Sequence, residues 1–260
     1  MRSRPGQGQH SGKMVVVMYT ARMMRKIPVL LLSLMLLAAL ALAGKGHYLS
    51  PGQVDLSRLL APPPANDSQR TRAEIETMLS LQQGRTPAQE AAARADREMS
   101  PFPFADVLGP RFVKDKLPNT AVFFEKVLSD QRLFVSPAKK HFNRPRPYIL
   151  DLSVEPSLSR PHNESYPSGH STWGHLAGII LANMVPEKAE QLYERAGRYA
   201  SQRVLGGVHY PSDVEAGKIA AAVIASALFQ SPAFQEDFAK AKAEVRGVLR
   251  LDGAPVPAGQ

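Results

Sequence analysis

Residues 165–175 read "SYPSGHSTWGH" and stand directly before an apolar run, Leu176 to Val185. Proline and glycine mark a turn, and the run that follows has the composition of a helix. One interpretation is purely structural: Ser171 or Thr172 caps the helix, and His170 has no chemical role. The other interpretation is that the free N–H groups at the helix N-terminus bind an anion on which His170 acts. The rest of the sequence bears on this choice.

Helical patterns dominate the chain on both sides of this turn. We expect helices that begin near Thr71, Thr86, Thr120, Ser171, Pro186, Ser212 and Ser231. Two of these starts carry a capping-box pattern, Thr86 with Gln89 and Ser212 with Glu215. An interruption is expected near Pro137, because proline lacks the N–H that a helix interior uses. Alternating strand-like patterns are scarce and no repeats occur, so we predict an all-α fold, a single-domain helical bundle.

The first 43 residues have the pattern of a secretion signal. They hold six basic and no acidic side chains and end in an apolar run of 17 residues, Ile27 to Ala43, whose last residues are Ala-Leu-Ala. This order is typical of a signal peptide that is cleaved on export. An uncleaved membrane anchor is the alternative, because the run is close to the minimum length of a span. We expect a periplasmic or secreted protein with no stable membrane domain after cleavage, and Met18 or Met23 is an alternative start.

The remaining sequence divides into an arm, a domain and a tail. Residues 44–70 are rich in proline and small polar residues, which predicts an extended arm laid over the helical domain of residues 71–250. Residues 251–260 are predicted to form a flexible tail. The formal charge of +9 comes mainly from the N-terminus, because 26 basic and 23 acidic residues remain without it, so we expect no nucleic-acid binding. The absence of cysteine excludes disulfides and thiolate chemistry.

Three separate stretches supply the groups that cleavage of a phosphate ester requires. These groups are cations for the dianion, a nucleophile, and an acid for the leaving oxygen. The first stretch is "KKHFNRPRP", residues 139–147, in which Lys139 and Arg146 are seven residues apart. Prolines on both sides of Arg146 hold its backbone extended. A solvated basic loop is the alternative interpretation of this stretch.

The second and third stretches each contain a histidine. In Pro167 to His170, the turn offers a hydroxyl at Ser168, a close backbone approach at Gly169 and the titratable ring of His170. In "RVLGGVHYPSD", which starts at Arg203, an aspartate follows a histidine by four residues, His209 and Asp213. The carboxylate can accept from one ring nitrogen and leave the other as a lone pair, as a nucleophile requires. A structural His–Asp contact at a helix start is the alternative.

Together, the three stretches resemble the signature shared by bacterial class A non-specific acid phosphatases, type 2 phosphatidic-acid phosphatases and vanadium haloperoxidases. That signature is Lys-x6-Arg-Pro, then Pro-Ser-Gly-His, then Ser-Arg-x5-His-x3-Asp. The matching positions are Lys139, Arg146, Pro147, residues 167–170, Arg203, His209 and Asp213. Gln202 stands where the family usually has serine, which puts one hydrogen bond to phosphate or to its supporting groups in doubt. The segments "LLAPPPA" and "ESYPSGHS" are similar to the class A group.

The resemblance implies a helical bundle of the acid phosphatase and haloperoxidase type and a role for each matching residue. His209 would attack phosphorus and form a phosphohistidine, Asp213 would orient it, and His170 would protonate the leaving oxygen and then activate water. Phosphoryl oxygens would be bound by Lys139, Arg146, Ser168, Gly169 and Arg203. No metal and no other cofactor is expected, and the substrates would be small phosphate esters. The oligomeric state stays open, although relatives often associate.

Other histidines and other functions remain to be placed. His170 and His175 are five residues apart, which does not put both rings on one helix face, and no metal motif is present. We expect His175 and Trp173 to pack in the core, whereas a pocket position for His141 and His162 stays open.

The leading hypothesis is a secreted, metal-independent acid phosphatase that acts on soluble phosphomonoesters. A vanadate-dependent haloperoxidase or a phosphotransferase using the same pocket is the alternative; the short chain and the class A-like arm argue against the haloperoxidase. A lipid phosphatase is disfavoured because the chain has at most one apolar span. A non-catalytic phosphate-binding protein is disfavoured because binding requires neither a nucleophile nor an acid.

Overall fold

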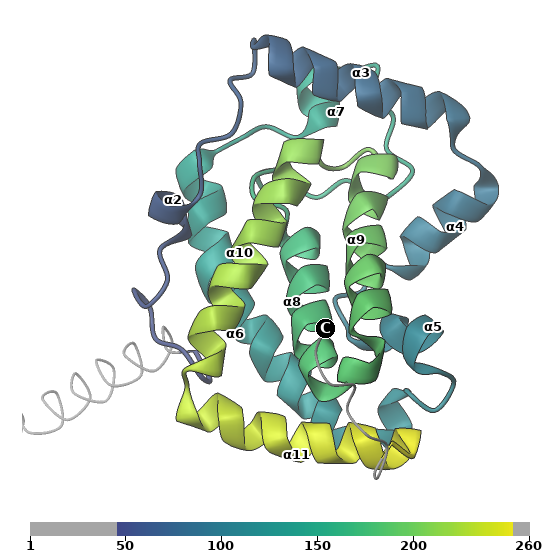
Figure 1. Ribbon diagram of the computed structural model, residues 1–260. Helices are drawn as coiled ribbons and strands as arrows, with labels where there is room; N and C mark the ends of the chain where they lie inside the picture. Colours follow the sequence, from purple (N-terminus) through teal and green to yellow (C-terminus); the bar gives the residue numbers. More distant parts are fainter. Residues whose placement is uncertain (1–45, 252–260) are drawn as a thin grey trace, which may run out of the picture. The chain divides into compact units, whose positions relative to one another are not determined.

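Helices make up the regular structure in residues 46–251, the part of the chain that the computed structural model describes (Figure 1). In chain order the α-helices are α2 (Leu56–Leu59), α3 (Gln69–Gly84), α4 (Pro87–Ala95), α5 (Ala105–Leu108), α6 (Pro118–Phe142), α7 (Pro147–Leu150), α8 (Gly169–Met184), α9 (Ala189–Leu205), α10 (Pro211–Phe229) and α11 (Pro232–Leu249). Short 3-10 turns are η1 (Phe102–Phe104), η2 (Lys114–Lys116) and η3 (Pro186–Lys188). The all-α prediction is confirmed. The predicted signal peptide, and the predicted tail apart from Leu251, lie outside the described residues.

Helix α8 is the centre of the bundle, with α6, α9 and α10 packed around it (Figure 1). Its apolar side chains are buried almost all round, which is the pattern of a core helix rather than a surface helix. Trp173 and Leu176 have no exposed surface. Gly174 lets α9 approach closely, because a Cβ there would lie 2.6 Å from Cδ1 of Tyr199. The small residue therefore sets the distance between the two helices.

The N-terminus of α8 is held against the start of α10. The N–H of Ser168 donates to the carbonyl of Asp213 at 2.9 Å. Gly217 makes room for this contact, since a Cβ there would lie 2.7 Å from the Ser168 carbonyl oxygen. The "PSGH" turn and the "HYPSD" turn, 40 residues apart in sequence, thus become neighbours.

The N-terminal arm is attached to the bundle through Asp130 of α6. The Asp130 carboxylate is fully buried and accepts the backbone N–H groups of His47, Tyr48 and Leu49 at 2.6, 2.8 and 2.9 Å. One carboxylate can satisfy three consecutive donors because its two oxygens carry four lone pairs. The segment predicted to be extended also contains one helical turn, α2, which Asp55 caps.

Several predicted helix starts are confirmed and two local predictions are wrong. The capping box of Thr86 and Gln89 is present at α4. Helix α6 is not interrupted at Pro137, because buried side chains on both sides hold the helix together despite the missing N–H. Ser212 does not cap α10 with Glu215: the helix starts at Pro211, and Ser212 bonds to Glu74 instead.

No single helix in residues 46–251 is both long enough and apolar enough to cross a membrane. The pair α10 and α11 passes the same criteria when taken together, and the two helices meet at 98°.

Candidate active site

A pocket of about 260 Å³ lies where the N-terminus of α8 meets the last turns of α6 and α9. Its walls bring the three predicted stretches together. The lining residues are Arg97, Met99, Lys139, Arg146, Leu158, Ser159, Pro161, Asn163, Gly169, His170, Arg203, Val208 and His209. Both predicted catalytic histidines face this one cavity. The lining contains no carboxylate, so the pocket is strongly positive.

His209 and Asp213 form the expected pair in the buried floor of the pocket. Nδ1 of His209 lies 3.1 Å from Oδ2 of Asp213, four residues further along the chain. Nη1 of Arg146 lies 2.9 Å from Nε2 of the same ring. A guanidinium only donates, so Nε2 must accept and Nδ1 must carry the proton. The contacts therefore assign the tautomer with its lone pair on Nε2.

Three buried cations line the same pocket as His209. Lys139, Arg146 and Arg203 are 5 %, 3 % and 3 % exposed. Apart from the contact of Arg146 with His209, their hydrogen bonds go to uncharged oxygens: Nζ of Lys139 to the carbonyls of Glu164 and Ser165, Nε of Arg146 to the carbonyl of Asn163, and Nη2 of Arg203 to the carbonyl of Ala93. In the described part of the chain none of the three pairs with a carboxylate.

The three cations retain unused capacity for an anion. Nε of Arg203 is buried without a hydrogen-bond partner among the described residues. Burying charge without a counter-charge is costly unless the site is completed by an ion of opposite sign. The cation set is therefore built for an anionic ligand.

The N-terminus of α8 adds backbone dipoles to the same wall. Gly169 is the first residue of α8 and lines the pocket. A helix N-terminus directs free N–H groups and a partial positive charge at whatever lies before it. Ser168 is the N-cap: its Oγ accepts the N–H of Ser171 at 3.2 Å. The cap is thus one turn earlier than a capping role for Ser171 or Thr172 would place it, and Ser168 itself is not among the residues that line the pocket.

His170 forms the opposite part of the wall. Its Nε2 lies 2.8 Å from the carbonyl oxygen of Arg97, and because a carbonyl only accepts, Nε2 carries a proton. Nδ1 is therefore the nitrogen that can take up and release a second proton. The ring is stacked on Tyr199, with centroids 6.3 Å apart and planes 23° from parallel.

Burial and the clustered cations lower the pKa values of the titratable groups. Burial, and then the charges of Arg203, Arg146 and Lys139, lower the pKa of His170 to about 4. The same causes hold the pKa of His209 well below its usual value, so this ring is neutral. Burial and the charge of Arg146 lower the pKa of Lys139 to about 7. A bound dianion would oppose each of these charge effects.

Several residues that complete the site were not predicted from the sequence. Arg144, inside the first stretch, donates to Oδ1 of Asp213 at 2.7 Å. Ser165 donates its hydroxyl to Oδ2 of the same carboxylate, and Asn163 accepts from Nη2 of Arg146 at 2.7 Å. Each lies beside a motif residue in sequence, but only the fold shows its partner. The carbonyl of Arg97 had no sequence signal at all.

Other residues that the sequence left open do not line the pocket. Gln202 lines a different hollow with Ser201 and Val204. His141 and His162 are likewise outside the pocket lining, and His175 bonds back to the carbonyl of Ser171 within α8. Among the described residues, no three histidine, aspartate or glutamate side chains are grouped as a metal site would need.

Comparison of the sequence with known proteins places this chain among the phosphatases. Residues 123–237 match the family model of the PAP2 superfamily. A non-specific acid phosphatase of Salmonella typhimurium is 32 % identical over 72 % of this chain and 78 % of its own length. An acid phosphatase of Zymomonas mobilis is 29 % identical over 72 % of this chain and 74 % of its own length.

One solved structure gives an independent comparison of the fold. The crystal structure of a bacterial vanadium-dependent iodoperoxidase matches with a TM-score of 0.51 at 20 % identity. The match covers 66 % of this chain and 52 % of that chain. The similarity concerns the helical fold.

Proposed function

This chain belongs to the PAP2 superfamily and is a phosphatase like the acid phosphatases it matches, and from that premise we propose that it is a secreted, metal-independent acid phosphatase that hydrolyses soluble phosphomonoesters through a phosphohistidine. The observation that carries the proposal is the pocket itself. Three buried cations without carboxylate partners, a helix N-terminus and two histidines surround one small cavity. Such a site suits a tetrahedral dianion that is transferred to a nitrogen nucleophile.

In this proposal the cations bind the phosphoryl group and balance its charge. Lys139, Arg146 and Arg203 contact its oxygens together with the N–H of Gly169. Fixed positive groups stabilise the charge on the equatorial oxygens of the transition state without the need to reorganise. The cations would thus serve the charge-balancing role that a metal ion has in other phosphatases.

The chemical steps then use the two histidines in turn. Nε2 of His209 attacks phosphorus after the N–H of Arg146 moves from that nitrogen to a phosphoryl oxygen. The phosphorus–oxygen bond of the ester breaks, and the departing oxygen takes a proton from His170. Asp213 stabilises the positive charge on the phosphorylated ring through Nδ1–H. Water then attacks phosphorus, His170 takes its proton, and His209 leaves with its lone pair restored.

Hydrolysis of p-nitrophenyl phosphate at mildly acidic pH, with a chelator present, tests the proposal. The wild-type protein should turn over, the His209→Ala variant should not, and a variant at the exposed His141, His141→Ala, should retain full activity. A denaturing quench at alkaline pH preserves phosphohistidine, so mass spectrometry should find the phosphoryl group on the peptide that contains His209. Loss of activity with the chelator, or a phosphoryl group on another side chain, would refute the mechanism.

Export is a separate part of the proposal. The pattern of residues 1–43 supports it. Expression of the full chain in a bacterial host, followed by N-terminal sequencing of the periplasmic fraction, tests it. An activity found in the membrane fraction with an intact N-terminus would indicate an anchor instead.

A further inference from the structure

The carboxylate of Asp213 contacts a buried cation, Arg144, in addition to His209. Arg144 is 2 % exposed and donates from Nη1 to Oδ1 of Asp213 at 2.7 Å. Oδ1 is thereby occupied on the side away from the ring, while Oδ2 faces Nδ1 of His209 at 3.1 Å. A rotation of the carboxylate would break both contacts. Arg144 therefore holds the carboxylate by one oxygen, Oδ1, while the other oxygen, Oδ2, selects the His209 tautomer.

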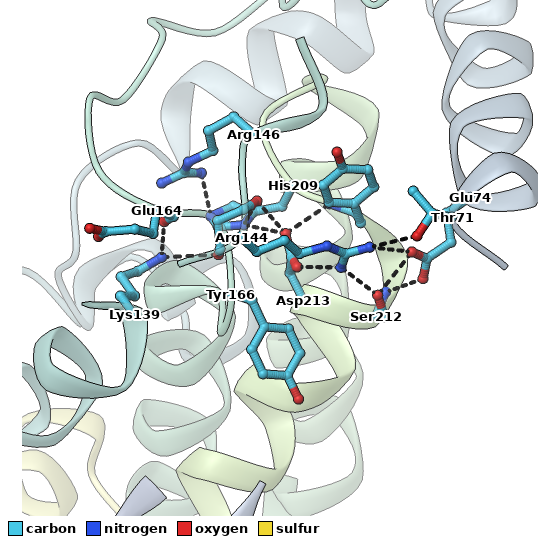
Figure 2. A network of polar contacts seen from close by, with 12 residues as sticks. Thr71, Glu74, Lys139, Arg144, Arg146, Glu164, Tyr166, His209, Ser212 and Asp213 are labelled. Carbon is cyan, nitrogen blue, oxygen red and sulfur yellow. Dashed lines mark hydrogen bonds and ion pairs between the residues drawn. The ribbon is translucent and has the colours of Figure 1, made fainter. Parts of the chain in front are cut away.

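Arg144 is itself held from helix α3. Its Nη2 donates to Oε2 of Glu74 at 3.0 Å (Figure 2). The ring of Tyr210 lies 3.8 Å from the guanidinium carbon. Glu74 also accepts the N–H of Ser212 at 2.8 Å and its hydroxyl at 2.9 Å. That hydroxyl in turn accepts from Nη1 of Arg144 at 2.7 Å. Both carboxylate oxygens of Glu74 are thus engaged, by Arg144 or by Ser212, the residue next to Asp213.

A buried carboxylate is costly unless a cation and hydrogen-bond donors compensate its charge. Glu74 is 8 % exposed, and a carboxylate is rarely that buried without a cation. The junction places two carboxylates, Glu74 and Asp213, on opposite edges of one guanidinium. This geometry fixes the guanidinium in its plane, because displacement toward either carboxylate lengthens the bond to the other.

We propose that Glu74 and Arg144 are positioning residues for the nucleophile: Glu74 holds Arg144, Arg144 holds Asp213, and Asp213 orients His209. This inference rests on the proposed function for the roles of His209 and Asp213. Glu74 lies outside residues 123–237, where the family match is found, so α3 extends the catalytic machinery beyond that matched region.

The Glu74→Gln variant tests the chain of contacts, because it keeps the shape of the side chain and removes its charge. Glu76→Gln is the matched control: it is the same substitution on the same helix at an exposed position. We expect kcat to fall about tenfold to a hundredfold in Glu74→Gln, the range typical of a residue that orients a catalytic group, with KM changed less than about threefold. Glu76→Gln should keep the wild-type kcat.

The Asp213→Asn background distinguishes positioning from a general loss of structure. If Glu74 acts through Asp213, Glu74→Gln should reduce the residual kcat of Asp213→Asn by less than about twofold. An equal loss in both backgrounds would overturn the proposal. So would an unchanged kcat in the Glu74→Gln variant.

A measurement without turnover separates this inference from the proposed function. In protein labelled with ¹⁵N-histidine, the Nδ1–H signal of His209, identified by its loss in His209→Gln, should shift or broaden in Glu74→Gln and stay in place in Glu76→Gln. If the wild-type chain shows no phosphatase activity but this signal shifts, the proposed function fails and the positioning contact stands. An unshifted signal refutes the contact whatever the activity.

If Glu74→Gln does not fold, Arg144→Lys replaces it, because lysine keeps the charge but cannot hold both carboxylates with one planar group. The same loss in kcat and the same change in the His209 signal are expected. Wild-type values for both in a folded Arg144→Lys protein would overturn the proposal.

Discussion

The depressed pKa of His170 makes a quantitative prediction about stability in acid. The pKa of this ring is about 4 in the folded protein and 6.5 in an unfolded chain. Above pH 6.5 the ring is neutral in both states and contributes nothing. As the pH falls from 6.5 to 4, only the unfolded chain takes up the proton, so the free energy of unfolding should decrease by about 1.4 kcal/mol per pH unit and about 3 kcal/mol in total. Below pH 4 both states are protonated, and the loss should level off.

Urea unfolding between pH 7 and pH 4 measures this effect. The wild-type curve contains contributions from every titrating group, so the prediction concerns its difference from His170→Asn, which lacks the ring. From pH 7 to pH 4, the free energy of unfolding of the wild type should fall by about 3 kcal/mol relative to that of His170→Asn. His141→Asn, at an exposed position, should follow the wild type. Parallel curves for the wild type and His170→Asn would refute the argument that burial and the cation cluster depress this pKa.

Bound phosphate should reverse part of the loss. Its charge offsets Arg203, Arg146 and Lys139, which are the groups that lower the pKa of His170 after burial itself. Repeating the titration with saturating inorganic phosphate should therefore raise the apparent pKa of His170. The free energy of unfolding should then decrease less as the pH falls. A protonated His170 next to a bound dianion is also the species that the proposed mechanism requires as its acid.

Three further predictions follow from other contacts. Asp213→Asn should lower kcat about a thousandfold in steady-state kinetics, because an amide can donate to Nδ1 of His209 and favour the wrong tautomer; a loss below tenfold would contradict the assigned role. Because Lys139 has a pKa of about 7 in the empty site, thermal stabilisation by sulfate should weaken between pH 6 and pH 8 in the wild type but not in Lys139→Arg. Gly174→Ala should destabilise the fold by about 1–3 kcal/mol because its Cβ would lie 2.6 Å from Tyr199, whereas Gly197→Ala, with open space around it, should stabilise by about 0.5–1 kcal/mol in the same urea unfolding experiment.

Several features of the site could be predicted from the sequence because they depend on interactions between residues that are close in the chain. The four-residue spacing of His209 and Asp213 puts a donor and an acceptor in reach across the start of one helix. The Pro-Ser-Gly-His turn was correctly predicted to start a helix, although its N-cap is Ser168 and not Ser171 or Thr172. These are properties of a few neighbouring residues, so a pattern of letters can carry them.

Features that depend on partners far away in the sequence could not be predicted from it. Ser212 has a good capping sequence with Glu215, yet its N–H and hydroxyl bond to Glu74 from a different helix. Pro137 has a helix-breaking sequence, yet the buried contacts of α6 outweigh the lost hydrogen bond. In both cases a tertiary contact stabilises the observed structure more than the local preference opposes it. No local sequence pattern predicts that contact.

By itself the sequence determined the helical composition of this protein and the local turns that carry the predicted site residues, since hydrophobic periodicity and capping operate over a few residues. Only the tertiary structure decided that these residues share one cavity, which cations there have no carboxylate partner in residues 46–251, and that Glu74 of α3 is linked to Asp213 through Arg144. The reason is physical: burial and charge pairing depend on what lies within a few ångströms in space, and in this chain those neighbours are about 70 residues apart.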